Sequence, residues 1–155
     1  MATNYGPTPG YLVWRLSLKW QAAVDRTVAP HGLTHAQYSA LASLRGMTRS
    51  GATPTQRELA DQTGLDEIFV SKLVRTLEGN GLVTRAAHPT DARARQLSLT
   101  EAGIATITPA IAAVQALLDE LTAPIGGLRS PDTTALVDTL QLLLAVPTPN
   151  QEEAP

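Results

Sequence analysis

The segment 91–103, which has the sequence DARARQLSLTEAG, constrains the fold of this chain more than any other part of it. Apolar and polar residues alternate over 95–99, as they do along a half-buried strand. A second strand fits residues 82–87, and Pro89-Thr90-Asp91 between the two supplies residues that favour turns. The sequence therefore predicts a β-hairpin with arginines near its tip, followed by a helix that Thr100 caps.

Two short helices are predicted just before this hairpin. Thr55-Gln56-Arg57-Glu58 matches a capping box, in which the Thr hydroxyl and the Glu carboxylate each bind a free backbone amide. Gly64 suits the left-handed end of that helix, and Asp66 can cap a second helix that runs to about Glu78. The second helix has one apolar stripe at helical spacing: Val70, Leu73, Val74 and Leu77. Helix, turn, helix and hairpin in this order form a winged helix-turn-helix.

The rest of the chain is predicted to be helical. Pro9 suits a first helical position, and Pro109 must kink or restart the fifth helix because proline lacks an amide hydrogen. The expected helices outside the winged part are 10–28, 35–46 (capped by Thr34), 101–122 and 131–145. The fold class is mainly α with a small antiparallel β-hairpin. We expect a flexible N-terminus over 1–9, a single domain over 10–146 and a disordered tail over 147–155. Within the domain, residues 10–46 and 104–146 are expected to form a helical dimerisation region, and residues 47–103 the winged helix-turn-helix.

Composition excludes several classes of function. The chain of 155 residues has no cysteine, so it has no disulfide, thiol nucleophile or thiolate metal site. His31, His35 and His88 lack metal-ligand spacing, and we expect no metal or cofactor. Neither a nucleophile elbow nor a Gly-rich phosphate loop is present, so an enzyme is not expected. No uninterrupted apolar run approaches the roughly eighteen residues of a membrane span, so we expect a soluble cytoplasmic protein without a membrane partner.

Charge is unevenly distributed along the chain. The formal net charge is -2, which is unusual for a protein that binds nucleic acid. Residues 45–95 carry eight cations against six acidic residues, whereas residues 101–155 carry one cation against seven acidic residues. The middle of the chain is therefore the part that is expected to contact DNA.

Two parts of the middle segment, the second short helix and the hairpin tip, carry cations that suit the two grooves of DNA. On the second short helix, the side opposite the apolar stripe carries Ile68, Ser71, Lys72 and Arg75, flanked by Phe69. A helix that enters a major groove needs such an outward face with hydrogen-bond donors. An ordinary amphipathic helix with solvated charges fits the same pattern.

The arginines of the hairpin suit the minor groove, whose negative potential attracts guanidinium groups. Arg93 and Arg95 lie near the predicted tip, and the Asp91 carboxylate can hold an arginine in one rotamer. A solubilising surface hairpin is the alternative interpretation.

These motifs together resemble the MarR family of bacterial transcription regulators. The most specific segments are LVTR at 82–85, DARAR at 91–95 and LTEAG at 99–103, and HGLTHAQY at 31–38 and RELA at 57–60 are also similar. The resemblance implies a homodimer that binds double-stranded DNA at a pseudo-palindromic operator, with repression more typical than activation. It also implies that the helix 66–78 is the recognition helix, that Arg93 enters the minor groove braced by Asp91, and that Thr55 and Gln56 contact phosphates.

One segment departs from the family pattern. Family members often have small hydroxyl residues early in the recognition helix, where this chain has Glu67-Ile68-Phe69. Bulky apolar side chains there can contact thymine methyl groups, or they can pack inward. Together with the low net basicity, this departure leaves a second function open, a winged-helix protein-interaction module without specific DNA binding.

The resemblance further implies a dimer interface and an effector pocket. The first helix, the later part of the fifth and the leucine-rich last helix are expected to form the dimer, or else to pack within one subunit. A small aromatic or phenolic effector is expected between the dimer region and the DNA-binding lobe, and it would shift the population of dimers toward one with a different spacing of the recognition helices. Candidates for the pocket lining, which are otherwise core residues, are Tyr11, Trp14, His35 and Tyr38.

Overall fold

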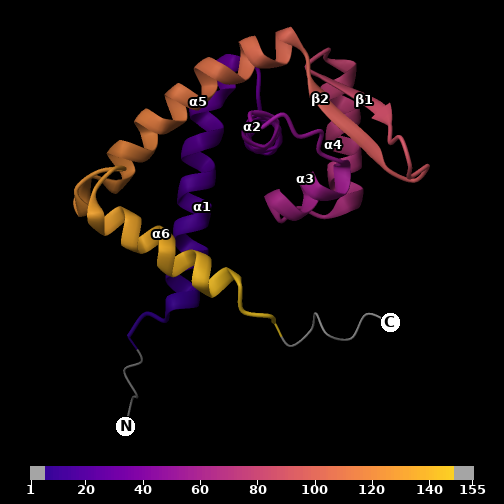
Figure 1. Ribbon diagram of the computed structural model, residues 1–155. Helices are drawn as coiled ribbons and strands as arrows, with labels where there is room; N and C mark the ends of the chain where they lie inside the picture. Colours follow the sequence, from indigo (N-terminus) through magenta and orange to yellow (C-terminus); the bar gives the residue numbers. More distant parts are fainter. Residues whose placement is uncertain (1–5, 149–155) are drawn as a thin grey trace. The chain divides into compact units, whose positions relative to one another are not determined.

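The computed structural model describes residues 6–148, which form six α-helices, two short 3₁₀ helices and one two-stranded sheet (Figure 1). The chain divides into two compact units, which meet within one helix between Val114 and Gln115. The elements are α1 (Pro9–Val28), η1 (Ala29–His31), α2 (His35–Thr48), α3 (Gln56–Thr63), α4 (Glu67–Gly79), β1 (Val83–Ala87), β2 (Arg95–Leu99), α5 (Glu101–Thr122), η2 (Ala123–Ile125) and α6 (Pro131–Leu144). The winged helix-turn-helix predicted from the sequence is confirmed. The predicted domain organisation stays a prediction.

The predicted caps set the helix boundaries in the first unit. Thr34 and Thr55 each form a full capping box with the residue three positions later. The Asp66 carboxylate accepts hydrogen bonds from the amides of Ile68 and Phe69, at 2.9 and 3.1 Å. These local contacts satisfy free amides at the helix ends, and so α2, α3 and α4 begin where the sequence predicts.

The core of the first unit lies between α2, α3, α4 and the sheet. All four residues of the predicted stripe on α4 are buried, which confirms the face assigned to the interior. Their buried partners from neighbouring elements include Leu41, Leu44, Leu59, Val83 and Leu97. Because this stripe faces inward, the opposite side of α4 faces solvent.

The hairpin is tied to both short helices. β1 and β2 pair antiparallel from Val83↔Leu99 to Ala87↔Arg95. The Leu97 amide also donates to the Pro54 carbonyl at 2.8 Å, which fastens β2 to the residue before the α3 cap. On the other side, the Arg85 Nε and Nη2 atoms contact Glu78 Oε2 at 2.8 and 2.7 Å, which joins β1 to the end of α4. The hairpin therefore has a fixed orientation relative to α3 and α4.

A close backbone approach joins the hairpin to α5. The Thr100 hydroxyl donates to the Gly81 carbonyl at 2.6 Å and accepts from the Gly103 amide at 2.9 Å. A Cβ atom at Gly103 would overlap the Leu82 carbonyl oxygen, so only glycine fits there. These contacts give a physical role to the LTEAG segment noted in the sequence.

One expectation about α5 is wrong in part. Pro109 neither ends nor restarts the helix, which is continuous over Glu101–Thr122 with the proline on its exposed side. In addition, the segment Glu101–Ile125 is long and apolar enough, by length and composition alone, to cross a membrane. The segment contains no long unbroken apolar run, because Thr106, Thr108, Pro109 and Gln115 interrupt it. Core residues Ile107, Ala110 and Val114 account for part of this apolar character.

The second unit contains the end of α5, η2 and α6. Asp119 Oδ1 accepts a hydrogen bond from the Leu128 amide at 2.8 Å, and the Thr133 hydroxyl donates to the Gly127 carbonyl at 2.7 Å. Thr133 is the buried residue of α6, and most of the apolar side chains of this helix are exposed. Of the tail predicted to be disordered, residues 149–155 lie outside the described residues, as do residues 1–5 at the other end.

Candidate nucleic-acid interface

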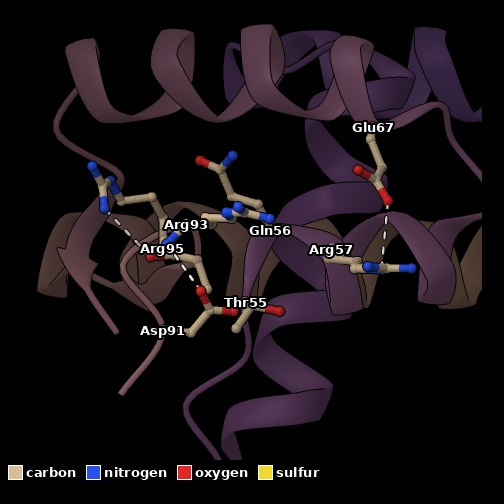
Figure 2. A pocket seen from close by; sticks show the side chains of 8 residues that line it. Thr55, Gln56, Arg57, Glu67, Asp91, Arg93 and Arg95 are labelled. Atoms are coloured by element: carbon tan, nitrogen blue, oxygen red, sulfur yellow. Dashed lines mark hydrogen bonds and ion pairs between the residues drawn. The ribbon is translucent and has the colours of Figure 1, made fainter. Parts of the chain in front are cut away.

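A hollow of about 380 Å³ lies in the first unit where α3, α4 and the hairpin loop meet (Figure 2). Three separate parts of the sequence supply its lining. These residues are Thr55, Gln56, Arg57, Glu67, Asp91, Arg93, Ala94 and Arg95. The structure thus brings together the beginning of α3, the beginning of α4 and both arginines of the hairpin tip. Five of the lining residues are among the DNA contacts predicted from the sequence: Thr55, Gln56, Asp91, Arg93 and Arg95.

The two hairpin arginines are available to a ligand. Both are exposed, and neither makes an ion pair with another described residue. Arg95 Nη1 donates to the adjacent Ala94 carbonyl at 3.4 Å, a weak contact (Figure 2). No other described residue therefore neutralises their charges, and a site for a phosphate backbone or a narrow groove needs such free cations.

The predicted role of Asp91 needs correction. Its carboxylate accepts a hydrogen bond from the Arg93 backbone amide at 3.0 Å and does not contact the Arg93 guanidinium (Figure 2). Asp91 also uses its own carbonyl, which accepts from the Ala94 amide at 3.1 Å. Asp91 thus fixes the backbone of the loop that carries Arg93. The sequence had predicted that Asp91 would instead hold the arginine side chain in one rotamer.

His88 is a second loop-fixing residue, which the sequence interpretation missed. Its Nδ1 atom accepts hydrogen bonds from the amides of Thr90 and Asp91, at 3.2 and 3.1 Å. Those two amides belong to the turn that leads to Arg93. A side-chain acceptor two residues before a turn amide is the available signal in the sequence, where the three histidines are interpreted only as structural or exposed residues rather than metal ligands.

We predict that His88→Ala weakens DNA binding by about fivefold or more, because the turn loses two side-chain hydrogen bonds, each worth about 0.5–1.5 kcal/mol. His88→Asn supplies an amide oxygen that can accept from the residue two positions later, so this variant should retain affinity within about twofold. Fluorescence polarisation with a labelled duplex measures both. Equal affinity for the wild type and His88→Ala would show that this contact does not position the loop.

The outward face of α4 carries the predicted contacts. Lys72 and Arg75 are exposed and Ser71 is half-buried. Ile68 and Phe69 are 69% and 46% exposed, so they point to solvent, and the alternative that they pack inward is wrong. Cationic and apolar side chains therefore share one accessible helix face.

At the beginning of α3, the Thr55 hydroxyl already makes hydrogen bonds within the protein. The Thr55 hydroxyl accepts from the Glu58 amide at 3.2 Å and contacts the Glu58 carboxylate at 3.1 Å. Gln56 Oε1 is buried and, among the described residues, has no hydrogen-bond partner. Because a buried acceptor without a partner is unfavourable, a donor that enters the hollow gains an interaction there. The phosphate contacts predicted for Thr55 and Gln56 stay predictions.

One ion pair crosses the hollow. Arg57 Nε lies 3.6 Å from Glu67 Oε1, and both side chains are largely exposed (Figure 2). An exposed pair of this kind adds little to stability. It does reduce the negative potential that Glu67 would otherwise present to a nucleic acid.

The four candidate effector residues do not line one hollow in the first unit. Tyr11 and Trp14 are exposed on α1, with ring centres 6.2 Å apart. His35 lines a separate hollow of about 420 Å³ formed by α1 and the start of α2, where its amide donates to Asp25 Oδ1 at 2.8 Å. Tyr38 is half-buried and does not line it, and burial raises the pKa of its hydroxyl.

The fold and this surface define a winged helix-turn-helix protein, and comparison with known proteins agrees. A sequence profile described as "MarR family" matches residues 31–94. An uncharacterized HTH-type transcriptional regulator of Bacillus subtilis (strain 168), YdcH, is 39% identical over 108 residues, which cover 70% of this chain and 74% of the relative. The chain belongs to the MarR family of transcriptional regulators. The family and the relatives compared are regulators and not enzymes.

Solved structures of family members have the same fold. The repressor CouR bound to a 23-mer DNA duplex is 30% identical, with a TM-score of 0.75 and coverage of 88% of this chain and 92% of its own. CouR from Rhodococcus jostii RHA1 bound to p-coumaroyl-CoA is 29% identical, with a TM-score of 0.75 and coverage of 91% and 94%. The regulator MosR of M. tuberculosis in complex with DNA is 26% identical, with a TM-score of 0.70 and coverage of 88% and 96%.

Proposed function

We propose that this regulator is a cytoplasmic repressor that binds a pseudo-palindromic operator as a homodimer and is released by a small molecule. The observation that carries the proposal is the hollow described above, where two arginines of the hairpin, which form no ion pair within residues 6–148, lie beside the starts of α3 and α4. In this arrangement α4 enters the major groove, and Arg93 enters the adjacent minor groove. CouR and MosR, which share the fold, are each described in complex with DNA.

A titration against the DNA that flanks its own gene tests this function. Fluorescence polarisation at two salt concentrations, with random duplex as competitor, separates specific from general binding. Specific binding that weakens with salt supports the proposal. Binding no tighter than to random DNA supports the alternative function, a protein-interaction module.

Apolar surface that one subunit leaves exposed supports the proposed homodimer. In the first unit, every residue of α1 from Tyr11 to Lys19 is exposed, although most of them are apolar. In the second unit, α6 exposes Val137, Leu142, Leu143 and Leu144. Exposed apolar side chains gathered on one helix, as on each of these two, are typical of a protein interface. A second copy of the chain is the occupant that the two half-sites of a palindrome require.

We predict that Leu143→Glu converts the dimer to a 16.4 kDa monomer and lowers operator affinity more than tenfold. A buried charge at the interface lacks a partner, whereas in the monomer residue 143 is exposed and its replacement leaves the subunit folded. Sedimentation velocity measures the mass, and Gln141→Glu on the same helix is the matched control. A Leu143→Glu protein that remains dimeric would show that α6 lies outside the interface.

The effector class proposed here is a small aromatic or phenolic molecule. The hollow beside His35 has apolar and polar lining from α1 and the start of α2, which suits a molecule of this class. CouR is described bound to p-coumaroyl-CoA, the thioester of a phenolic acid. Adding p-coumaroyl-CoA, or free phenolic acids, to the preformed DNA complex tests the class. A loss of polarisation supports release by this class, and an unchanged signal across the panel argues against it.

A further inference from the structure

We propose that Ile68 and Phe69 recognise the C5-methyl groups of thymines in the major groove, so that each half-site of the operator contains thymine at the bases they contact. This inference rests on the DNA-binding function proposed above and adds the base that the recognition helix selects.

The two side chains are exceptional within the winged part of the chain. Over residues 47–103, all of which the structure describes, they are the only large apolar side chains that are exposed. The other apolar residues of α4 form the buried stripe. Exposing an aliphatic and an aromatic side chain to water is unfavourable, and contact with an apolar group removes that cost.

Their place on α4 directs them at base edges. Ile68 and Phe69 lie in the first turn of the helix, and residues near the N-terminus of a recognition helix reach the bases. Lys72 and Arg75 follow Ile68 by four and seven residues, so they lie on the same face further along. The cations attract the phosphate backbone to this face. The apolar pair is therefore covered by DNA when the helix enters the groove.

The backbone of this turn is held in place. The Asp66 carboxylate accepts hydrogen bonds from the amides of both Ile68 and Phe69. The neighbouring Glu67 is within 3.6 Å of Arg57, so its carboxylate has a cationic partner on α3. The two apolar side chains are thus presented from a capped helix end.

Thymine is the base that matches this chemistry. In the major groove it alone presents a methyl group, whereas cytosine, adenine and guanine present hydrogen-bond donors and acceptors. An isoleucine and a phenylalanine contribute no hydrogen bond to a base edge. They can distinguish thymine through the methyl contact and through the loss of water from it.

The test uses the full chain and a duplex enriched by it from a random library. In that duplex each thymine is replaced in turn by deoxyuridine, which lacks only the methyl group. At the contacted positions we expect about a fourfold loss of affinity for each methyl removed, the value for one buried methyl-sized group. Replacing the symmetry-related pair should give about a fifteenfold loss.

Two variants assign the effect to these side chains. In Ile68→Ala and Phe69→Ala the ratio of affinities for the thymine and uracil duplexes should approach one. Lys72→Ala is the matched control, because it should weaken binding to both duplexes while leaving their ratio unchanged. Thermal melting checks that the variants fold, which is expected because the replaced side chains are exposed.

The outcomes separate this inference from the proposed function. Failure to enrich any duplex over random DNA would overturn both. An enriched duplex on which no thymine-to-uracil replacement changes the affinity would overturn the methyl contact alone. The methyl contact would also be overturned if both alanine variants kept the wild-type ratio.

Discussion

Replacing Gly103 with alanine is expected to lower the free energy of unfolding by about 3 kcal/mol. A Cβ atom at this position would overlap the Leu82 carbonyl oxygen, and backbone cannot move aside as a flexible side chain can. The same movement would disturb the Thr100 amide, which donates to that carbonyl at 3.1 Å. Thermal or urea unfolding measures the loss, which corresponds to a melting temperature lower by about 6–12 °C in a chain of this size.

Gly46→Ala is the matched control for this prediction. Gly46 also lies within a helix, but a Cβ there would meet nothing within 4 Å. Alanine is the better helix former by about 1 kcal/mol, so Gly46→Ala should stabilise the protein slightly. Stabilisation by Gly103→Ala of the same size would show that α5 does not approach the hairpin as closely as described.

The helix boundaries were predictable from the sequence because they depend on local contacts. Thr34, Thr55 and Asp66 each bind amides within three residues of themselves, so a short window contains the full signal. The apolar stripe of α4 was predictable for a similar reason, since helical spacing alone assigns its buried side.

The contacts that orient the hairpin were not predictable in this way. The hydrogen bond from Leu97 to Pro54 joins residues far apart in the sequence, and nothing local in either segment indicates it. The Arg85–Glu78 ion pair depends on the return of the chain after α4. The requirement for glycine at position 103 likewise arises from a partner twenty-one residues earlier.

The candidate surface was found from the sequence by charge and resemblance, but the geometry of its loop was not. Asp91 was expected to contact a guanidinium, and it binds the Arg93 amide instead, because an Asp side chain readily accepts from the amide two residues later. The orientation of Ile68 and Phe69 could not be decided from the sequence. It was decided by the packing of the stripe on the other side of α4.

Replacing Arg93 with alanine is expected to weaken operator binding by about thirtyfold or more. An arginine that contacts DNA contributes about 1–3 kcal/mol, and a dimer loses two of them. The Arg93 side chain is exposed, and the one hydrogen bond that Arg93 makes with the described residues comes from its backbone amide. Replacing the side chain should therefore leave the fold unchanged. Arg93→Lys keeps the charge but not the planar fork and should fall between the two. Fluorescence polarisation at fixed salt measures all three proteins.

Arg129→Ala is the control for general loss of charge. Arg129 is an exposed arginine of the second unit, far in the sequence from the candidate surface, and its replacement should leave affinity within about twofold. Equal losses for Arg93→Ala and Arg129→Ala would mean that only total charge matters. If Arg93→Ala bound the operator as tightly as the wild type, the hairpin would not enter the minor groove, and the contacts of α4 and the start of α3 would have to account for the affinity.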